Sequence, residues 1–182
     1  MRKVLLYSLL VNAWCLTSCN TATPENYFER AVLSCNTLHG FAGDGLQREL
    51  ESPSVEMING NKDQFAPMKR GKIVDERIAA ITSNLAQVKN LKSTSETKEL
   101  LDASLALYDF VLPVYENEYR ELARLYDDGA SEQSIRHFVE SIHTKYYSEY
   151  EELYNKLVAA GKPYAARHQI PVNWDVRTSP AL

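Results

Sequence analysis

The sequence predicts an all-α protein, an up-down antiparallel bundle of three long helices with a weaker fourth helix at the N-terminus. Two observations support this prediction. Apolar residues recur every three or four positions along most of the chain, which is the spacing of one face of an α-helix. The connections between the long apolar segments are short and polar, and short connections force neighbouring helices to run antiparallel.

The weaker helix is expected over residues 24–51. Thr23 is a suitable N-cap, and Pro24 fits the first helical position. Three glycines within residues 40–45 weaken the segment, because each interior glycine costs about 1 kcal/mol relative to alanine. The apolar spacing nevertheless continues across them. The sequence therefore allows either one continuous helix, which we favour, or two helices on a shared axis with a break at 40–45.

A loop is expected over residues 53–70, which contain two prolines and an Asn-Gly-Asn sequence. Its apolar residues Met57, Ile58 and Phe65 are expected to cover one end of the core. The length of this link also allows the first helix to lie across the bundle.

The three long helices are expected over residues 72–92, 95–127 and 131–160. In each of them apolar residues step by three and four, which places them on one buried face. Gly161 is expected to end the last helix, and Pro163 to block its continuation.

Tyrosines are concentrated on the last two of these helices, around Pro113. A proline in a helix interior removes a backbone hydrogen bond and kinks the helix. Antiparallel pairing brings Tyr108 and Tyr115 level with Tyr146 and Tyr150. The favoured interpretation is packing at the edge of the core. The alternative is a tyrosine-lined cleft, opened by the kink, that binds a sugar, a peptide or a hydrophobic ligand.

Glu118 occupies an apolar position of the helix that contains Pro113. Buried carboxylates are rare unless they are paired. We therefore expect Glu118 to be shielded from solvent and to have a cationic partner, Arg70 or Lys72, with His143 as the second choice. The alternatives are an exposed position at the end of the bundle and a carboxylate that binds a ligand. The candidate ligand-binding residues are Tyr108, Tyr115, Glu118, His143, Tyr146 and Tyr150.

No motif in the sequence specifies a catalytic chemistry. Glu140 and His143 form a single Glu-x-x-His step, whereas a di-metal site needs two such steps and two further glutamates. Nucleophile-elbow, phosphate-loop and dinucleotide motifs are absent. Cys35 is interpreted as a small buried hydrophobic residue. We expect no catalytic residue, no metal site and no cofactor.

The N-terminal residues have the pattern of a secretory leader. Arg2 and Lys3 precede an apolar stretch, residues 4–16, that is too short and too interrupted to span a bilayer. The end of this leader and the residue after it, Leu16-Thr17-Ser18-Cys19, resemble the lipobox of bacterial lipoproteins, the pattern recognised by lipoprotein signal peptidase. The resemblance implies cleavage before Cys19 and acylation of its sulfur. An ordinary cleaved signal peptide is the alternative.

Four segments are expected: a leader (1–18), a lipidated tether (19–23), a helical domain (24–170) and a tail (171–182). Removal of the leader takes two positive charges from a chain of net charge −4, and an acidic domain is unsuited to binding nucleic acid. The lipobox resemblance implies a domain outside the cytoplasm, held by its lipid on a membrane of the bacterial cell envelope. The outer membrane is favoured over the inner one.

Three classes of function remain open. The favoured class is an envelope-anchored protein-interaction module of adaptor or inhibitor type, with a protein partner. The second is a small-ligand-binding lipoprotein that uses the tyrosine cleft near Pro113, and an enzyme is the least favoured. An exposed apolar patch would support the first class, and an enclosed tyrosine-lined pocket the second.

Overall fold

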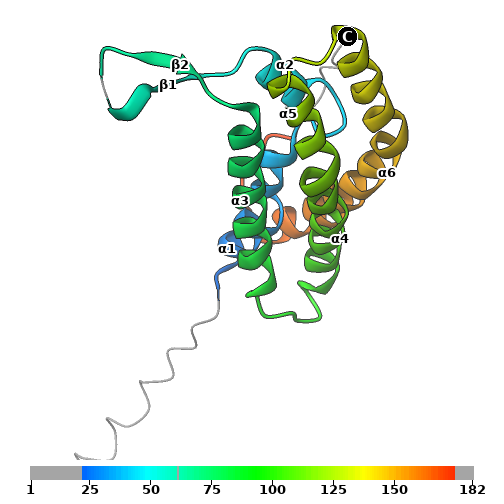
Figure 1. Cartoon of the computed structure of the whole chain (residues 1–182). Coiled ribbons are helices and arrows are strands. Elements are labelled where there is room, and N and C mark those ends of the chain that lie inside the picture. Colours follow the sequence, from blue (N-terminus) through cyan, green and yellow to red (C-terminus); the bar gives the residue numbers. More distant parts are fainter. Residues whose placement is uncertain (1–21, 61, 175–182) are drawn as a thin grey trace, which may run out of the picture.

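The computed structural model describes residues 22–60 and 62–174, which are mostly helical, as predicted (Figure 1). Cys19, the leader and most of the tail lie outside the described residues. In chain order the elements are α1 (Pro24–Ala31), the 3₁₀ helix η1 (Leu33–Leu38), α2 (Gly45–Glu51), β1 (Val55–Met57), the 3₁₀ turn η2 (Ile58–Gly60), β2 (Phe65–Pro67), α3 (Arg70–Lys89), α4 (Lys98–Val114), the π-helical turn η3 (Tyr115–Tyr119), α5 (Arg120–Asp127) and α6 (Glu132–Arg167).

The favoured continuous helix over residues 24–51 is wrong. Thr23 caps α1 as expected, but α1 ends at Ala31, and a 3₁₀ helix and a tight turn separate it from α2. The turn depends on two glycines whose backbones touch. A Cβ atom on Gly40 would lie 2.9 Å from the Cα atom of Gly45, and Gly40 has a φ of +80°. Only glycine tolerates both conditions, so the chain folds back here instead of continuing as a helix.

A β-hairpin projects from the helices between α2 and α3 (Figure 1). The strands β1 and β2 pair antiparallel, with Met57 opposite Phe65. The expectation that Met57, Ile58 and Phe65 cover the core is wrong, because 52%, 38% and 57% of these residues is exposed. The expected loop thus contains a short sheet that turns its large apolar side chains toward solvent.

The helix that contains Pro113 begins at Lys98 rather than at Ser95 and continues through η3 to the end of α5. Where we expected a kink, the structure has the π-helical turn, which starts two residues after Pro113. The side-chain amide of Asn117 donates a hydrogen bond of 2.6 Å to the Pro113 carbonyl oxygen. Such turns inside α-helices occur frequently at functional sites.

The last helix, α6, does not end at Ala160 as expected. It continues through Gly161 and Pro163 as far as Arg167. Pro163 removes one backbone hydrogen bond, but the turn that follows it buries Tyr164 and Ala165 in the core. Burial of these side chains stabilises the last turn more than the missing hydrogen bond weakens it.

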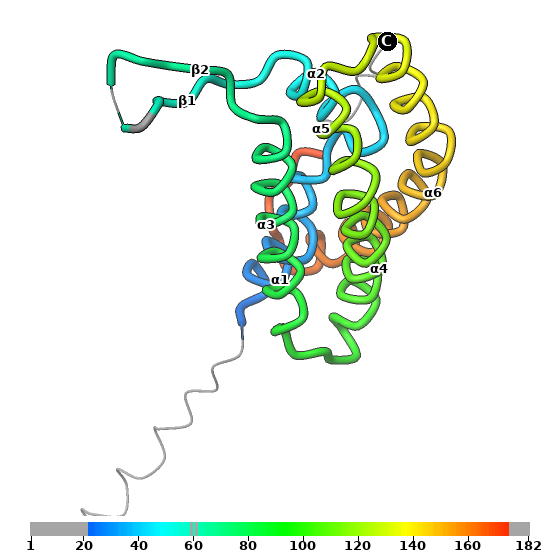
Figure 2. The backbone as a smooth tube through the Cα atoms, viewed as in Figure 1, coloured from blue at the N-terminus to red at the C-terminus, as the bar shows by residue number. Residues whose placement is uncertain are grey.

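The core lies where the helices meet. α3 lies alongside α4 and α5, and α6 packs along α4 and curves around the molecule (Figure 2). α1 and η1 cover the remaining side. α1 contacts α3, α4 and α6, and η1 contacts α3 and α4. Within the described ranges, no helix combines the length and the apolar character needed to span a membrane.

Candidate functional site

Phe41 occupies the centre of the predicted tyrosine cluster. The turn between η1 and α2 inserts this fully buried side chain among the helices. Its ring centroid lies 5.8 Å from that of Tyr115, 6.0 Å from that of Tyr119 and 5.0 Å from that of Tyr150. Two of the tyrosines that the alternative interpretation placed along an open cleft, Tyr115 and Tyr150, therefore pack on a side chain of the same chain.

The hydroxyl groups of the central tyrosines are removed from water. Tyr108 and Tyr115 are 0% and 2% exposed, and burial raises the pKa of both phenols far above the usual range. The neighbouring Cys35 thiol raises the pKa of Tyr108 further. Tyr150 donates a hydrogen bond of 2.9 Å to the Leu38 carbonyl oxygen. The raised pKa values keep the Tyr108 and Tyr115 phenols protonated at neutral pH.

Ala42, next to Phe41, is held by side chains from two helices. Its N–H donates to the Tyr119 hydroxyl oxygen at 2.8 Å, and its carbonyl oxygen lies 2.7 Å from Nδ1 of His143. Ala42 has a φ of +53°, which is unusual for a residue with a side chain. Burial raises the pKa of Tyr119 to about 12, although the hydrogen bond from Ala42 lowers it. Phe41 and Ala42 were not among the predicted site residues. The sequence feature that could have indicated them is an apolar pair flanked by Gly40 and Gly43.

Glu118 is shielded, as expected, with 24% of its side chain exposed. Its carboxylate accepts a hydrogen bond from the Tyr146 hydroxyl and forms an ion pair of 3.4 Å with Lys145. Both partners come from α6, so this group fastens the π-helical turn η3 to α6.

The expected cationic partners of Glu118 are wrong. The Arg70 backbone N–H and side chain both bind Asp127, at the end of α5. Lys72 forms an ion pair with Glu56 of the hairpin. His143 binds the Ala42 carbonyl and stacks on Tyr147, with ring centroids 4.6 Å apart. Lys72 and His143 thus have partners in the hairpin and in the turn after η1, two features that the apolar spacing did not predict.

The six predicted ligand-binding residues therefore separate into smaller groups. Tyr115 and Tyr150 contact Phe41, Glu118 contacts Tyr146, and Phe110 links the two groups through ring contacts of 6.1 Å to Phe41 and to Tyr146. His143 joins them only through Ala42, and Tyr108 lies beside Cys35. A ligand-binding role for the six stays a prediction.

Cys35 and Ser104 form a small polar contact inside the core. The Cys35 thiol donates to the Ala31 carbonyl oxygen at 3.4 Å and lies 3.8 Å from the Ser104 hydroxyl oxygen. Cys35 is completely buried. Across residues 22–60 and 62–174, no three His, Cys, Asp or Glu side chains are grouped so that they could hold a metal ion.

Among the residues that the structure describes, the three most exposed large apolar side chains lie on the hairpin. Because side chains alternate along a strand and Met57 pairs with Phe65, Val55, Met57 and Phe65 lie on the same side of the sheet, which we call the hairpin face. Val55 is 63% exposed, more than either of the others. Glu56 points to the opposite side and pairs with Lys72, which ties the hairpin to α3.

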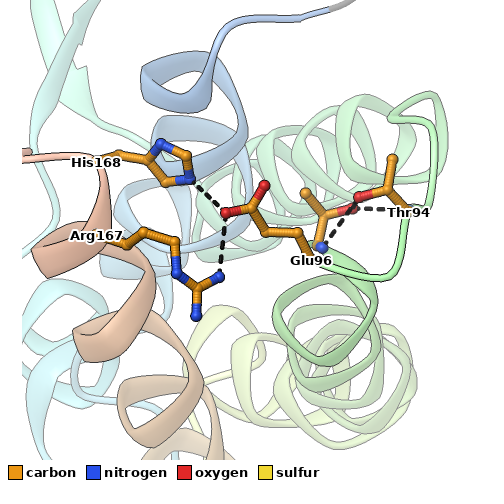
Figure 3. A network of polar contacts seen from close by, with 5 residues as sticks. Thr94, Glu96, Arg167 and His168 are labelled. Atoms are coloured by element: carbon orange, nitrogen blue, oxygen red, sulfur yellow. Dashed lines mark hydrogen bonds and ion pairs between the residues drawn. The ribbon is translucent and has the colours of Figure 1, made fainter.

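A polar network joins the end of α6 to the connection between α3 and α4 (Figure 3). Glu96 accepts hydrogen bonds from Arg167 at 3.0 Å and from His168 at 2.9 Å. These two bonds, with that from Arg167 the stronger, hold the pKa of Glu96 below its ordinary value. At the same end of the molecule, the Tyr27 hydroxyl of α1 donates to the Lys92 carbonyl oxygen at 2.8 Å.

Comparison of the chain with protein-family models, with curated proteins and with solved structures gave no match in any of the three.

Proposed function

We propose that the chain is a lipoprotein of the bacterial cell envelope, anchored by acyl groups on Cys19, and that its helical domain is a protein-interaction module of adaptor or inhibitor type. The exposed hairpin face carries this proposal. Val55, Met57 and Phe65 are each more than half exposed on an element that projects from the domain. Exposed apolar patches on otherwise polar surfaces mark sites of interaction.

The hairpin and the start of α1 lie at opposite ends of α3, which supports the proposal. The Tyr27 hydroxyl binds the Lys92 carbonyl just after the end of α3, whereas the hairpin leads into the start of α3 at Arg70. A helix of 20 residues is about 30 Å long. The proposed tether, residues 19–23, spans roughly 17 Å at most. The hairpin face would then point away from the membrane, toward a protein partner.

The contacts at the base of the hairpin support a surface that is held in place. Glu56 pairs with Lys72, and the Arg70 guanidinium donates to the Leu50 carbonyl oxygen at 3.1 Å. We propose further that α3, the α4–α5 stretch and α6 form one antiparallel bundle that acts as the rigid support. A preorganised surface loses less conformational entropy when a partner binds.

Site-specific photocrosslinking in intact cells tests the interaction. A benzoylphenylalanine in place of Phe65 should give a discrete crosslinked product, and the same group at His137, exposed on α6, should not. The serine substitution Met57→Ser should weaken the Phe65 product several-fold, since it removes apolar area from the same face. The absence of a product at Phe65, or the same product from both positions, would show that the hairpin is not the contact surface.

Metabolic labelling with a palmitate analogue tests the anchor. Cys19→Ala should abolish the label and release the protein from the membrane fraction. Cys15→Ala removes the cysteine that lies within the leader and should leave both properties unchanged. Labelling that survives Cys19→Ala would overturn the lipid anchor without bearing on the hairpin.

A further inference from the structure

A hollow of about 300 Å³ lies between η1, α6 and the segment that follows α6. This volume is at the lower end of the range for small-molecule sites. Its lining includes the side chains of Leu33, Asn36, His39, Tyr154, Val172 and Trp174. We call it the Trp174 hollow, and it is separate from both the tyrosine cluster around Phe41 and the hairpin face.

One wall of the hollow follows from the geometry of η1. A 3₁₀ helix has three residues per turn, so side chains three positions apart lie in one row. Leu33 and Asn36 of η1, followed by His39 at its C-cap, form such a row along one edge of the hollow. Leu33 is 42% exposed, although it is a large apolar residue next to the core. The row thus presents one apolar and two polar side chains to a molecule bound in the hollow.

The opposite wall is Trp174, which three contacts hold in position. Its ring packs edge-on against Phe28, with the centroids 5.8 Å apart. Gly161 leaves room for the indole, because a Cβ atom there would lie 3.2 Å from Cη2 of Trp174. The ammonium group of Lys162 lies 5.8 Å from the ring centroid. A fixed aromatic surface of this kind favours a flat aromatic partner.

The lining of the hollow contains no Asp, Glu, Lys or Arg side chain. An ion would lose its hydration on entry and meet no opposite charge, so a neutral molecule is favoured. Asn36 and His39 have no side-chain hydrogen bond or ion pair with any residue that the structure describes. An amide and an imidazole together supply donors and acceptors. We propose that the Trp174 hollow binds a small, neutral, aromatic molecule that carries a hydrogen-bonding group.

Tryptophan fluorescence tests this site directly. Trp14 and Trp174 are the two tryptophans of the chain, so Trp14→Phe in the full-length chain leaves Trp174 as the reporter. The probe is 4-bromobenzamide, whose ring is flat, whose amide donates and accepts, and whose bromine quenches indole emission. At pH 8, where histidine side chains are ordinarily neutral, we expect saturable quenching with a dissociation constant on the order of 1 mM or below.

Two controls make the result specific. In a Lys162→Gln background, which removes the cation beside the Trp174 ring, the isosteric anion 4-bromobenzoate should bind at least tenfold more weakly than 4-bromobenzamide, because the lining offers it no counter-charge. Leu33→Glu, which places a carboxylate on the wall, should weaken 4-bromobenzamide at least tenfold. The matched substitution Ile58→Glu, in η2, should leave binding unchanged. Both positions are exposed, and thermal unfolding of the two variants checks that neither disturbs the fold.

Several outcomes would overturn the proposal. These are unsaturable quenching, equal quenching by the benzoate, and an unchanged affinity in Leu33→Glu. If the probe binds only to a chain truncated after Trp174, the residues after Trp174 would be the natural occupant of the hollow. A Trp174 emission that changes with protein concentration, without probe, would assign it to a second copy of the chain.

Discussion

The carbonyl oxygen of Ala42 accepts a hydrogen bond from Nδ1 of His143, 2.7 Å away, so the proton of this imidazole sits on Nδ1 when the ring is neutral. The N–H of Ala42 donates to Tyr119. Both main-chain polar groups of one residue in a left-handed conformation are therefore satisfied by side chains. These two bonds join the turn that carries Phe41 to η3 and to α6.

Loss of the His143 imidazole should destabilise the protein. His143→Ala leaves the Ala42 carbonyl without its donor, and we expect the free energy of unfolding to fall by about 1 kcal/mol. His137→Ala on the same helix removes an exposed imidazole and should change it by less than about 0.5 kcal/mol. Urea unfolding measures both. Equal effects of the two substitutions would mean that the bond to Ala42 contributes nothing to stability.

Alanine at Gly40 should be more harmful than alanine at Gly129. Both glycines have positive φ, but a Cβ atom on Gly129 meets nothing within 4 Å, whereas one on Gly40 would lie 2.9 Å from Gly45. We expect a cost of about 1 kcal/mol at Gly129 and a further 1–3 kcal/mol at Gly40, roughly that of overpacking. Thermal unfolding compares them, and similar melting temperatures would disprove the close approach.

The contact between Glu118 and Tyr146 should be detectable as a coupling energy. In a double-mutant cycle with Glu118→Gln and Tyr146→Phe, we expect a coupling of about 1 kcal/mol, because the pair is partly shielded from water. The ion pair to the exposed Lys145 should contribute less, and Lys145→Ala should cost under about 1 kcal/mol. Additive effects of the first two substitutions would contradict the hydrogen bond.

Glu96 should make stability depend on pH in the acid range. Its pKa in the folded protein is held below the ordinary value of 4.5, first by Arg167 and then by His168. The stabilisation is therefore complete above pH 4.5 and disappears as pH falls through the lowered pKa. At pH 6, Glu96→Gln should have a lower melting temperature than the unsubstituted protein, and the two melting temperatures should converge toward pH 2. Equal melting temperatures of the two proteins at pH 6 would contradict this role of Glu96.

Glu118 illustrates how far sequence reasoning reached at the candidate site. Its place in an apolar row correctly indicated a shielded carboxylate. The identity of its partners depends on how α6 is rotated relative to η3. It also depends on Lys72, which pairs with Glu56 of the hairpin, an element that the apolar spacing of the sequence does not reveal. A shift of one residue in helix register turns a side chain by about 100°, so helical spacing predicts that a partner is needed but not which residue supplies it.

The sequence by itself determined the helical class and the N-cap of α1 at Thr23, because apolar spacing and capping are local properties. Only the tertiary structure decided where helices stop. Glycines break the segment at Gly40, where two backbones touch, but not at Gly161, where the missing side chain admits Trp174. Local preferences amount to about 1 kcal/mol per glycine, and burial of one large side chain contributes more. The same residue type therefore ends one helix and lies inside another, according to what packs against it.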